Sequence, residues 1–86
     1  KLTRATKAMG GLALKFISPG YDGVPDRIVL FPGGRIAFVE VKAPGEKPRP
    51  LQLSRHRLLR RLGFRVYVLD AAEQIGGILD EIESQL

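Results

Sequence analysis

The sequence predicts an α/β fold in which a mixed four-stranded sheet is flanked by helices, in the order α-β-β-β-α-β-α. Two apolar runs joined by Pro32-Gly33-Gly34 predict a tight hairpin, because glycine supplies the positive φ that a short turn requires. Leucines at helical spacing over residues 50–62, followed by another apolar run, predict a helical crossover into the last strand. A chain of 86 residues is expected to form a single domain over residues 1–86.

Residues that begin or end helices and strands bound the individual elements. A short helix over residues 1–9 is expected to end at Gly10-Gly11, and Pro50 suits the first turn of the helix that Gly63 ends. The expected strands span residues 12–17, 26–31, 35–42 and 64–69. The inner face of the helix at 50–62 is expected to consist of Leu51, Arg55, Leu58, Leu59 and Leu62. The last helix, beginning after Asp70, is expected to place Ile75, Ile78, Leu79 and Ile82 on one face.

Composition restricts the classes of partner and site. Cysteine is absent and His56 is the single histidine, which excludes a disulfide framework and a structural zinc site. Fourteen Lys and Arg residues against nine Asp and Glu give a net charge of +5, which favours nucleic acid as partner, with solubility alone as the alternative. No apolar run approaches the ~18 residues that span a membrane, so we expect no membrane partner. His56 itself is expected to be solvated rather than catalytic.

Two acidic residues are expected to face each other across the hairpin. Counting six residues back from Pro32 and six forward from Gly34 gives Asp26 and Glu40, whose Cβ atoms would lie ~4.5–5.5 Å apart. Two carboxylates this close repel unless a cation lies between them, and oxygen ligands suit Mg²⁺. The backbone carbonyl of Val41 can add a ligand. The pattern therefore predicts a metal site, with a solvent-exposed hairpin carrying surface charges as the alternative reading.

Lys42 shares the strand face of Glu40 because side chains alternate along a strand. An ammonium group beside a divalent metal suits a phosphate or an attacking water. The combination of two carboxylates, a metal and a cation predicts metal-dependent hydrolysis of phosphodiester bonds.

These motifs, taken together, resemble a known family. The segment Gly23-Val24-Pro25-Asp26, the hairpin, Glu40-Val41-Lys42 and then Gln52 look like the VRR-NUC family, the virus-type replication-repair nucleases of the PD-(D/E)xK superfamily. The similarity spans roughly residues 10–75 and implies a restriction-endonuclease-like core with Mg²⁺ or Mn²⁺ as cofactor. It implies the catalytic residues Asp26, Glu40, Lys42 and Gln52, and the metal ligands Asp26, Glu40 and the Val41 carbonyl.

The resemblance also implies individual roles. Lys42 would position or polarise the attacking water, and Gln52 would orient Lys42, the water or the scissile phosphate. Lys15 and Ser18, near the end of the first strand, would contact DNA phosphate. One departure matters: the family usually has a glutamate on its first helix, and no acid precedes Asp22 here. Either that glutamate lies upstream of the first residue, or the site works with fewer carboxylates, or the metal binds weakly. Asp22 in the loop is read first as a turn residue, with a substitute metal ligand as the alternative.

The remaining basic residues either contact DNA or belong to an ordinary solvent-exposed surface. Lys47 and Arg49 belong to a loop at residues 43–49, which serves either as a DNA-gripping flap or as a plain surface linker. Arg57 and Arg61 lie one helical turn apart, so they either grip a phosphate backbone or belong to a solvated helix face.

The function that we expect is structure-selective cleavage of DNA by an endonuclease, first as a four-way (Holliday) junction resolvase that acts as a homodimer. A flap or general duplex nuclease, and a non-catalytic DNA-binding module that keeps the fold, are the alternatives. Gly76-Gly77 within an apolar helical pattern indicates either close approach of a second helix, which would favour a dimer, or a kink in the helix. The expected partner is branched or duplex DNA, and the expected location is cytoplasmic: bacterial, or host cytoplasm for a viral protein.

Overall fold

The computed structural model describes residues 1–85. Its elements are α1 (Leu2–Ala8), β1 (Leu12–Lys15), β2 (Arg27–Phe31), β3 (Arg35–Val41), α2 (Pro50–Arg61), β4 (Arg65–Leu69), a 3₁₀ turn η1 (Ala72–Gln74) and α3 (Ile75–Glu83). The predicted order is confirmed, although β1 ends two residues before the predicted boundary. Within the described residues, none of the helices combines the length and the apolar character that crossing a membrane requires.

The sheet is mixed, as predicted, with the strand order β1-β2-β3-β4. The first three strands are antiparallel neighbours, and β4 pairs parallel to β3. Gly33 and Gly34 form the β2–β3 turn with φ values of 85° and 77°. Residues other than glycine rarely adopt this backbone conformation. A parallel pair cannot be joined by a short turn, so α2 provides the crossover between β3 and β4.

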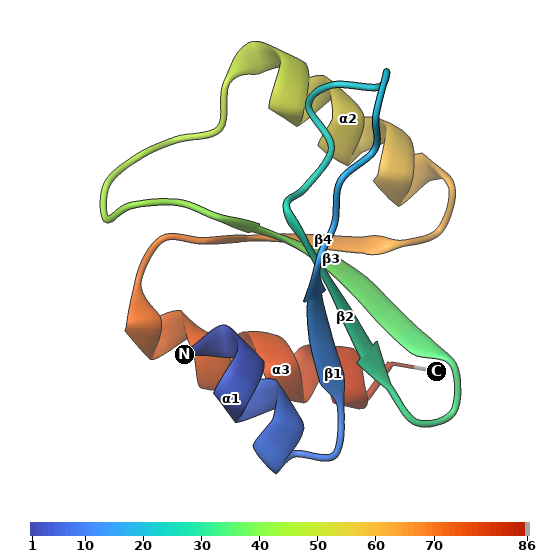
Figure 1. The fold of residues 1–86 in the computed structure, drawn as a ribbon, viewed down its shortest axis with the longest axis vertical. Coiled ribbons are helices and arrows are strands. Elements are labelled where there is room, and N and C mark those ends of the chain that lie inside the picture. Colours follow the sequence, from blue (N-terminus) through green and yellow to red (C-terminus); the bar gives the residue numbers. More distant parts are fainter. Residues whose placement is uncertain (86) are drawn as a thin grey trace.

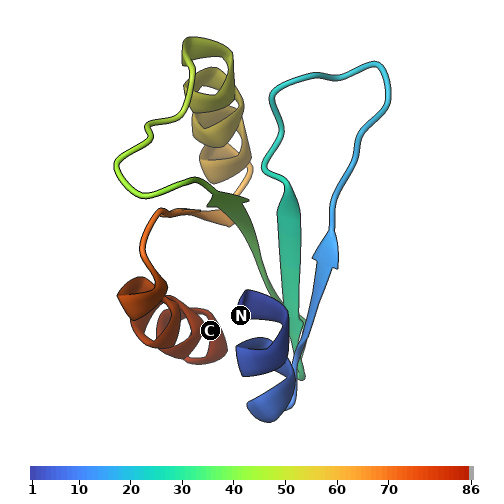
Figure 2. The same cartoon turned by 60° about the vertical axis from the view of Figure 1, so that its left-hand side comes forward.

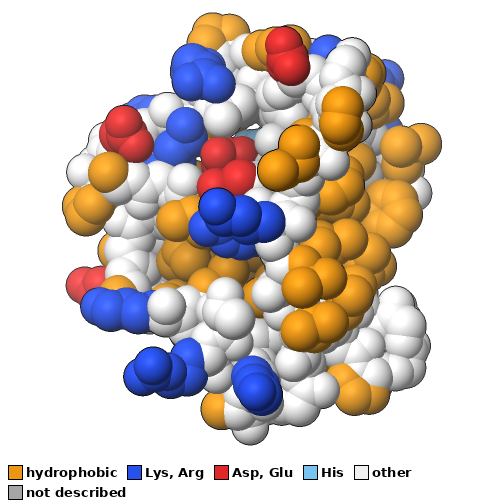
Figure 3. Space-filling model, viewed as in Figure 1, with side chains coloured by type: hydrophobic (Ala, Val, Ile, Leu, Met, Phe, Trp, Pro, Cys, Tyr) orange, Lys and Arg blue, Asp and Glu red, His pale blue; other side chains and the backbone are white. Residues whose placement is uncertain are grey.

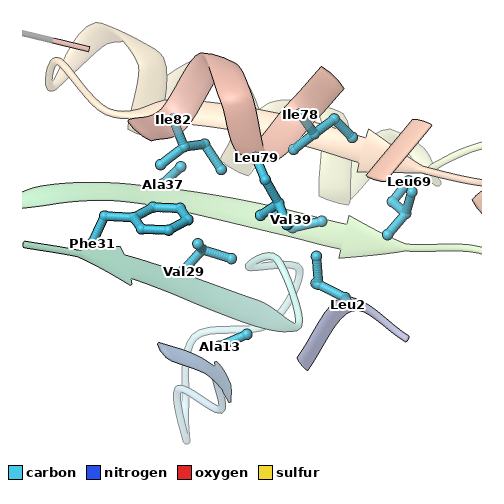
Figure 4. Close-up of a cluster of buried hydrophobic side chains, with 10 residues drawn as sticks. All are labelled: Leu2, Ala13, Val29, Phe31, Ala37, Val39, Leu69, Ile78, Leu79 and Ile82. Carbon is cyan, nitrogen blue, oxygen red and sulfur yellow. The ribbon is translucent and has the colours of Figure 1, made fainter. Parts of the chain in front are cut away.

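Helices α1 and α3 contact each other and cover one face of the sheet (Figures 1 and 2). Alternation along β3 turns Ala37 and Val39 toward these helices and Phe38 and Glu40 toward the opposite face. The hydrophobic core between the sheet and the two helices (Figure 4) consists of Leu2, Ala13, Val29, Phe31, Ala37, Val39, Leu69, Ile78, Leu79 and Ile82. Three of the four predicted inward residues of α3 belong to this cluster, and the fourth, Ile75, packs against it.

Helix α2 packs on the opposite face, and its inner side differs from the prediction. The buried side chains of α2 are Gln52 and His56, whereas Leu51 and Leu62 are 45% and 64% exposed. The prediction that His56 is solvated is therefore wrong. The physical reason is that α2 covers the face of the sheet on which the buried Glu40 lies, so two polar side chains of the helix face that carboxylate.

A long loop between β1 and β2 is anchored on α2. The Nε–H of Arg55 donates to the carbonyl of Asp22 at 2.8 Å, and its guanidinium lies 3.8 Å from the ring centroid of Tyr21. Gly23 has a φ of 90°, and an added Cβ there would lie 2.8 Å from Cγ of Leu51. Only glycine allows this close approach, which fixes the chain just before the start of β2.

Candidate active site

The loop on α2 delivers Asp26 to the start of β2, beside the end of β3. Arg27 pairs with Val39, and continuing this antiparallel register by one residue sets Asp26 opposite Glu40. The backbone N–H of Val41 donates to Oδ1 of Asp26 at 3.0 Å. The other carboxylate oxygen lies 3.5 Å from the guanidinium of Arg27. Asp26 is thus held across the two strands by the backbone of the Glu-x-Lys segment.

Glu40 is the most unusual side chain of the sheet because it is a carboxylate with only 4% of its surface exposed. Its Oε2 accepts a hydrogen bond from Nε2 of Gln52 at 3.3 Å, whereas its Oε1 has no hydrogen-bond partner. Burial raises the pKa of Glu40, and the negative charge of Asp26 raises it further, while Lys42 and Arg49 act in the opposite direction. A buried anion with an unpaired oxygen is costly unless a cation or a proton joins it.

The backbone of β3 turns the Val41 carbonyl toward Asp26. The N–H of Lys42 donates to the carbonyl of Leu69 on β4 at 2.8 Å. Because this peptide bond is trans, the Val41 carbonyl points the opposite way, to the β2 side of the strand. The half-buried side chain of Lys42 follows directly, at the end of the strand.

The donor set suits a divalent cation that prefers oxygen. Two carboxylates and a backbone carbonyl are the hard oxygen ligands that Mg²⁺ and Mn²⁺ take, and the carboxylate of Glu40 still has unused lone pairs because its Oε1 has no hydrogen-bond partner. Within residues 1–85, no group of three or more His, Cys, Asp or Glu residues could hold a metal ion, so the site has only these two acids. The N-terminal end of α1 reaches the same region, since Lys1 and Thr3 line a cavity of about 280 Å³ together with Val41 and Lys42.

Gln52 occupies the first turn of α2 and contacts Glu40 through its amide nitrogen. Its Oε1 accepts a hydrogen bond from the backbone N–H of Arg49 at 2.9 Å. Gln52 therefore caps the helix with one end of its amide and holds the carboxylate with the other. No hydrogen bond to Lys42 accompanies these two among the described residues, so Gln52 reaches the site through Glu40.

His56 is the site residue that sequence reasoning missed. Its Nε2 lies 3.8 Å from Oε1 of Glu40, and the side chain is 1% exposed. Burial lowers the pKa of His56, and the charges of Arg60 and Lys42 lower it further. The lowered pKa favours the neutral imidazole over the charged form in this contact with Glu40. Its position four residues after Gln52 was the available signal, because i and i+4 share a helix face.

The predicted DNA-binding residues fall into two groups. Lys15 lines a cavity of about 320 Å³ together with Asp26, so it lies beside the carboxylates. Ser18 is half-buried in the following loop, and Lys47 and Arg49 are exposed in the loop before α2.

Arg57 and Arg61 form the second group, away from the carboxylates. They line a groove of about 400 Å³ on the outer side of α2 with Ser54 and Arg60. None of the proposed metal ligands lines that groove. Figure 3 shows acidic side chains near the middle of one face with Lys and Arg side chains around them.

Comparisons with known proteins agree with this architecture. The family model of the VRR-NUC domain matches residues 8–73. The protein "Putative nuclease p44" of Acyrthosiphon pisum secondary endosymbiont phage 1 is 54% identical over 72 residues, which cover 84% of this chain and 77% of that protein. A solved structure of a VRR-NUC domain superposes with a TM-score of 0.85 at 36% identity, covering 92% of this chain and 86% of that chain. The chain therefore belongs to the VRR-NUC family of nuclease domains.

Proposed function

We propose that residues 1–86 form one catalytic domain that hydrolyses DNA phosphodiester bonds, with Mg²⁺ or Mn²⁺ held by Asp26, Glu40 and the Val41 carbonyl. The observation that carries the proposal is the buried, partly unpaired carboxylate of Glu40 beside a second carboxylate. A domain that only binds DNA gains nothing from burying an anion next to a polyanion. A metal site explains why the chain tolerates the cost.

The roles follow from what each group contacts. A bound divalent ion supplies Lewis-acid polarisation of the phosphate and lowers the pKa of the attacking water. Lys42, at the strand end next to the carboxylates, positions that water and stabilises the negative charge that develops on the phosphate. Gln52 fixes Glu40 through its amide. Lys15, Ser18, Lys47 and Arg49 hold phosphates on either side of the scissile bond.

The substrate that we propose is DNA of a particular shape. A domain of 86 residues with a catalytic edge has little surface left for reading bases, so backbone contacts and DNA geometry select the substrate. A four-way junction is the first choice. Arg57 and Arg61 in the outer groove then hold a second arm of the branched DNA. A flap or a plain duplex is the alternative substrate.

Paired cuts in a junction require two active sites, and we propose a homodimer. The edge strand β1 carries Leu12 and Leu14, which are 49% and 44% exposed, and Ile17 beyond it is 77% exposed. Figure 3 shows hydrophobic side chains gathered along one side of the molecule. Exposed apolar patches of this kind mark interfaces. Light scattering of the wild type and of Leu14→Glu tests this surface: the wild type should be dimeric and the variant monomeric.

The predicted helix contact at Gly76-Gly77 stays a prediction. An added Cβ at either glycine meets no atom within 4 Å, so packing within the described residues does not explain the pair.

Cleavage assays on linear, flap and four-way DNA with Mg²⁺ or Mn²⁺ test the catalytic assignment. Asp26→Ala and Lys42→Ala should abolish cleavage, while melting temperature and DNA affinity remain close to those of the wild type. Asp22→Ala is the matched control, because Asp22 is exposed and only its backbone carbonyl makes a described contact. Equal cleavage by the wild type and both site variants on every substrate would refute the assignment.

A second candidate is a non-catalytic DNA-binding module, which the lack of a third acid at the site, among the described residues, favours. It predicts steeply salt-dependent DNA binding with no cleavage and no uptake of Mg²⁺ or Mn²⁺. Calorimetric titration of the wild type with each metal separates the two candidates, because only the nuclease requires the metal.

A further inference from the structure

His56 is a buried polar side chain to which the proposed catalysis gives no role. Within residues 1–85, the buried side-chain polar atoms that lack a hydrogen-bond partner are Oε1 of Glu40 and both ring nitrogens of His56. These unpaired groups belong to two neighbouring side chains. A buried polar group without a partner destabilises the folded state relative to a paired one. A leucine or phenylalanine would avoid that cost at position 56, so the imidazole needs a functional explanation.

The geometry of α2 directs two side chains at one carboxylate. Gln52 and His56 lie one helical turn apart on the same face. The amide of Gln52 donates to Oε2 of Glu40 at 3.3 Å, and Nε2 of His56 lies 3.8 Å from Oε1. The two oxygens of Glu40 thus each face a different group on a single helix. The distance of 3.8 Å exceeds a hydrogen bond by less than 1 Å, which a small shift of the ring removes.

We propose that His56 is a positioning residue whose Nε2–H closes on Oε1 of Glu40 and, together with Gln52, fixes the plane of that carboxylate for the divalent cation. The inference rests on the proposed metal site and deepens it. His56 is 1% exposed and lies on the helix side of Glu40, so it acts through Glu40 and does not touch the DNA. Groups that hydrogen-bond a metal-ligating carboxylate set its orientation, and removing one typically costs 10–100-fold in metal affinity.

Calorimetry with Mn²⁺ alone tests the inference without any cleavage reaction. His56→Phe keeps a buried ring but removes the donor, so Mn²⁺ affinity should fall 10–100-fold. Its melting temperature in EDTA should equal or exceed that of the wild type, because two unpaired nitrogens disappear. His56→Gln restores a donor at the reach of Nε2 and should recover most of the affinity, whereas the shorter His56→Asn should not. Ser54→Ala, on the outer side of α2, is the control for the helix.

The possible results distinguish a positioning role of His56 from a packing role and from the absence of a metal site. A wild-type Kd for Mn²⁺ in His56→Phe would overturn the positioning role and leave the metal site intact. Loss of affinity in His56→Phe and His56→Gln together, with lower melting temperatures in both, would mean that His56 serves the packing of α2 alone. If His56→Phe does not fold, equal affinities of the Gln and Asn variants would overturn the proposal in the same way. Absence of Mn²⁺ uptake by the wild type would instead refute the proposed metal site itself.

Discussion

Replacing Glu40 by glutamine tests whether the buried carboxylate destabilises the metal-free protein and whether a bound metal ion offsets that destabilisation. The substitution keeps the shape of the side chain and the hydrogen bond from Gln52, but it removes a charge that is almost fully buried. The new amide can donate to Nε2 of His56 once the ring adopts the tautomer with its proton on Nδ1, on the side where the carboxylate oxygen has no partner. Glu40→Gln should therefore stabilise the metal-free protein while destroying metal binding.

The size of the effect follows from the unpaired oxygen. Leaving one buried polar group without a partner costs about 1–3 kcal/mol, and recovering the lower end of this range would raise the melting temperature of a domain this small by about 4–8 °C. The effect depends on pH because burial and Asp26 raise the pKa of Glu40 in the folded state above 4.5. The folded wild type favours the protonated carboxyl, so its contribution to stability is lost as pH rises through that raised pKa. The advantage of glutamine should grow from pH 5 to pH 8.

Thermal unfolding by circular dichroism in EDTA, at pH 5 and pH 8, measures this difference for the wild type and Glu40→Gln. Adding Mn²⁺ at pH 8 should raise the melting temperature of the wild type and leave that of the variant unchanged. Asp22→Asn, at an exposed acid, provides the control for simple loss of one negative charge. A variant less stable than the wild type in EDTA at both pH values would refute the reasoning.

Three further predictions concern the surroundings of the site. Arg55→Ala removes the contact that anchors the β1–β2 loop and should lower the free energy of unfolding by about 1 kcal/mol, measured by urea denaturation. Gly23→Ala should cost more than Gly45→Ala in the same assay, since both glycines have positive φ but only Gly23 faces a crowded side chain; equal costs would contradict the close approach. The double change of Arg57 and Arg61 to glutamine should reduce the slope of log affinity against log salt by about 2, and an unchanged slope would remove the outer groove from the DNA interface.

Local signals in the sequence were sufficient for the fold and for the pairing of the two strands at the site. The glycines of the β2–β3 turn fixed the hairpin, and the register of a hairpin follows from its turn, so counting residues brought Asp26 opposite Glu40. Helix α3 was predictable because its apolar side chains face an apolar core.

The inner face of α2 was not predictable by the same rule. Hydrophobic periodicity assumes that polar side chains face water, but this helix covers a buried carboxylate. Gln52 and His56 face inward for that reason, and the face is rotated by about 100° from the leucine face that begins at Leu51. Sequence rules are expected to fail at functional sites, and α2 follows that expectation. The anchoring of Asp22 by Arg55 joins residues far apart in the chain, which no local pattern reveals.

The side-chain amide of Gln52 links the loop before α2 to strand β3. Its oxygen holds the backbone of Arg49, and its nitrogen holds Glu40. When DNA binds to Lys47 and shifts the 43–49 segment, the backbone of Arg49 would move Gln52, and Gln52 would change the position of the Glu40 carboxylate. Substrate capture and metal affinity should therefore be thermodynamically linked, with each strengthening the other by the same factor.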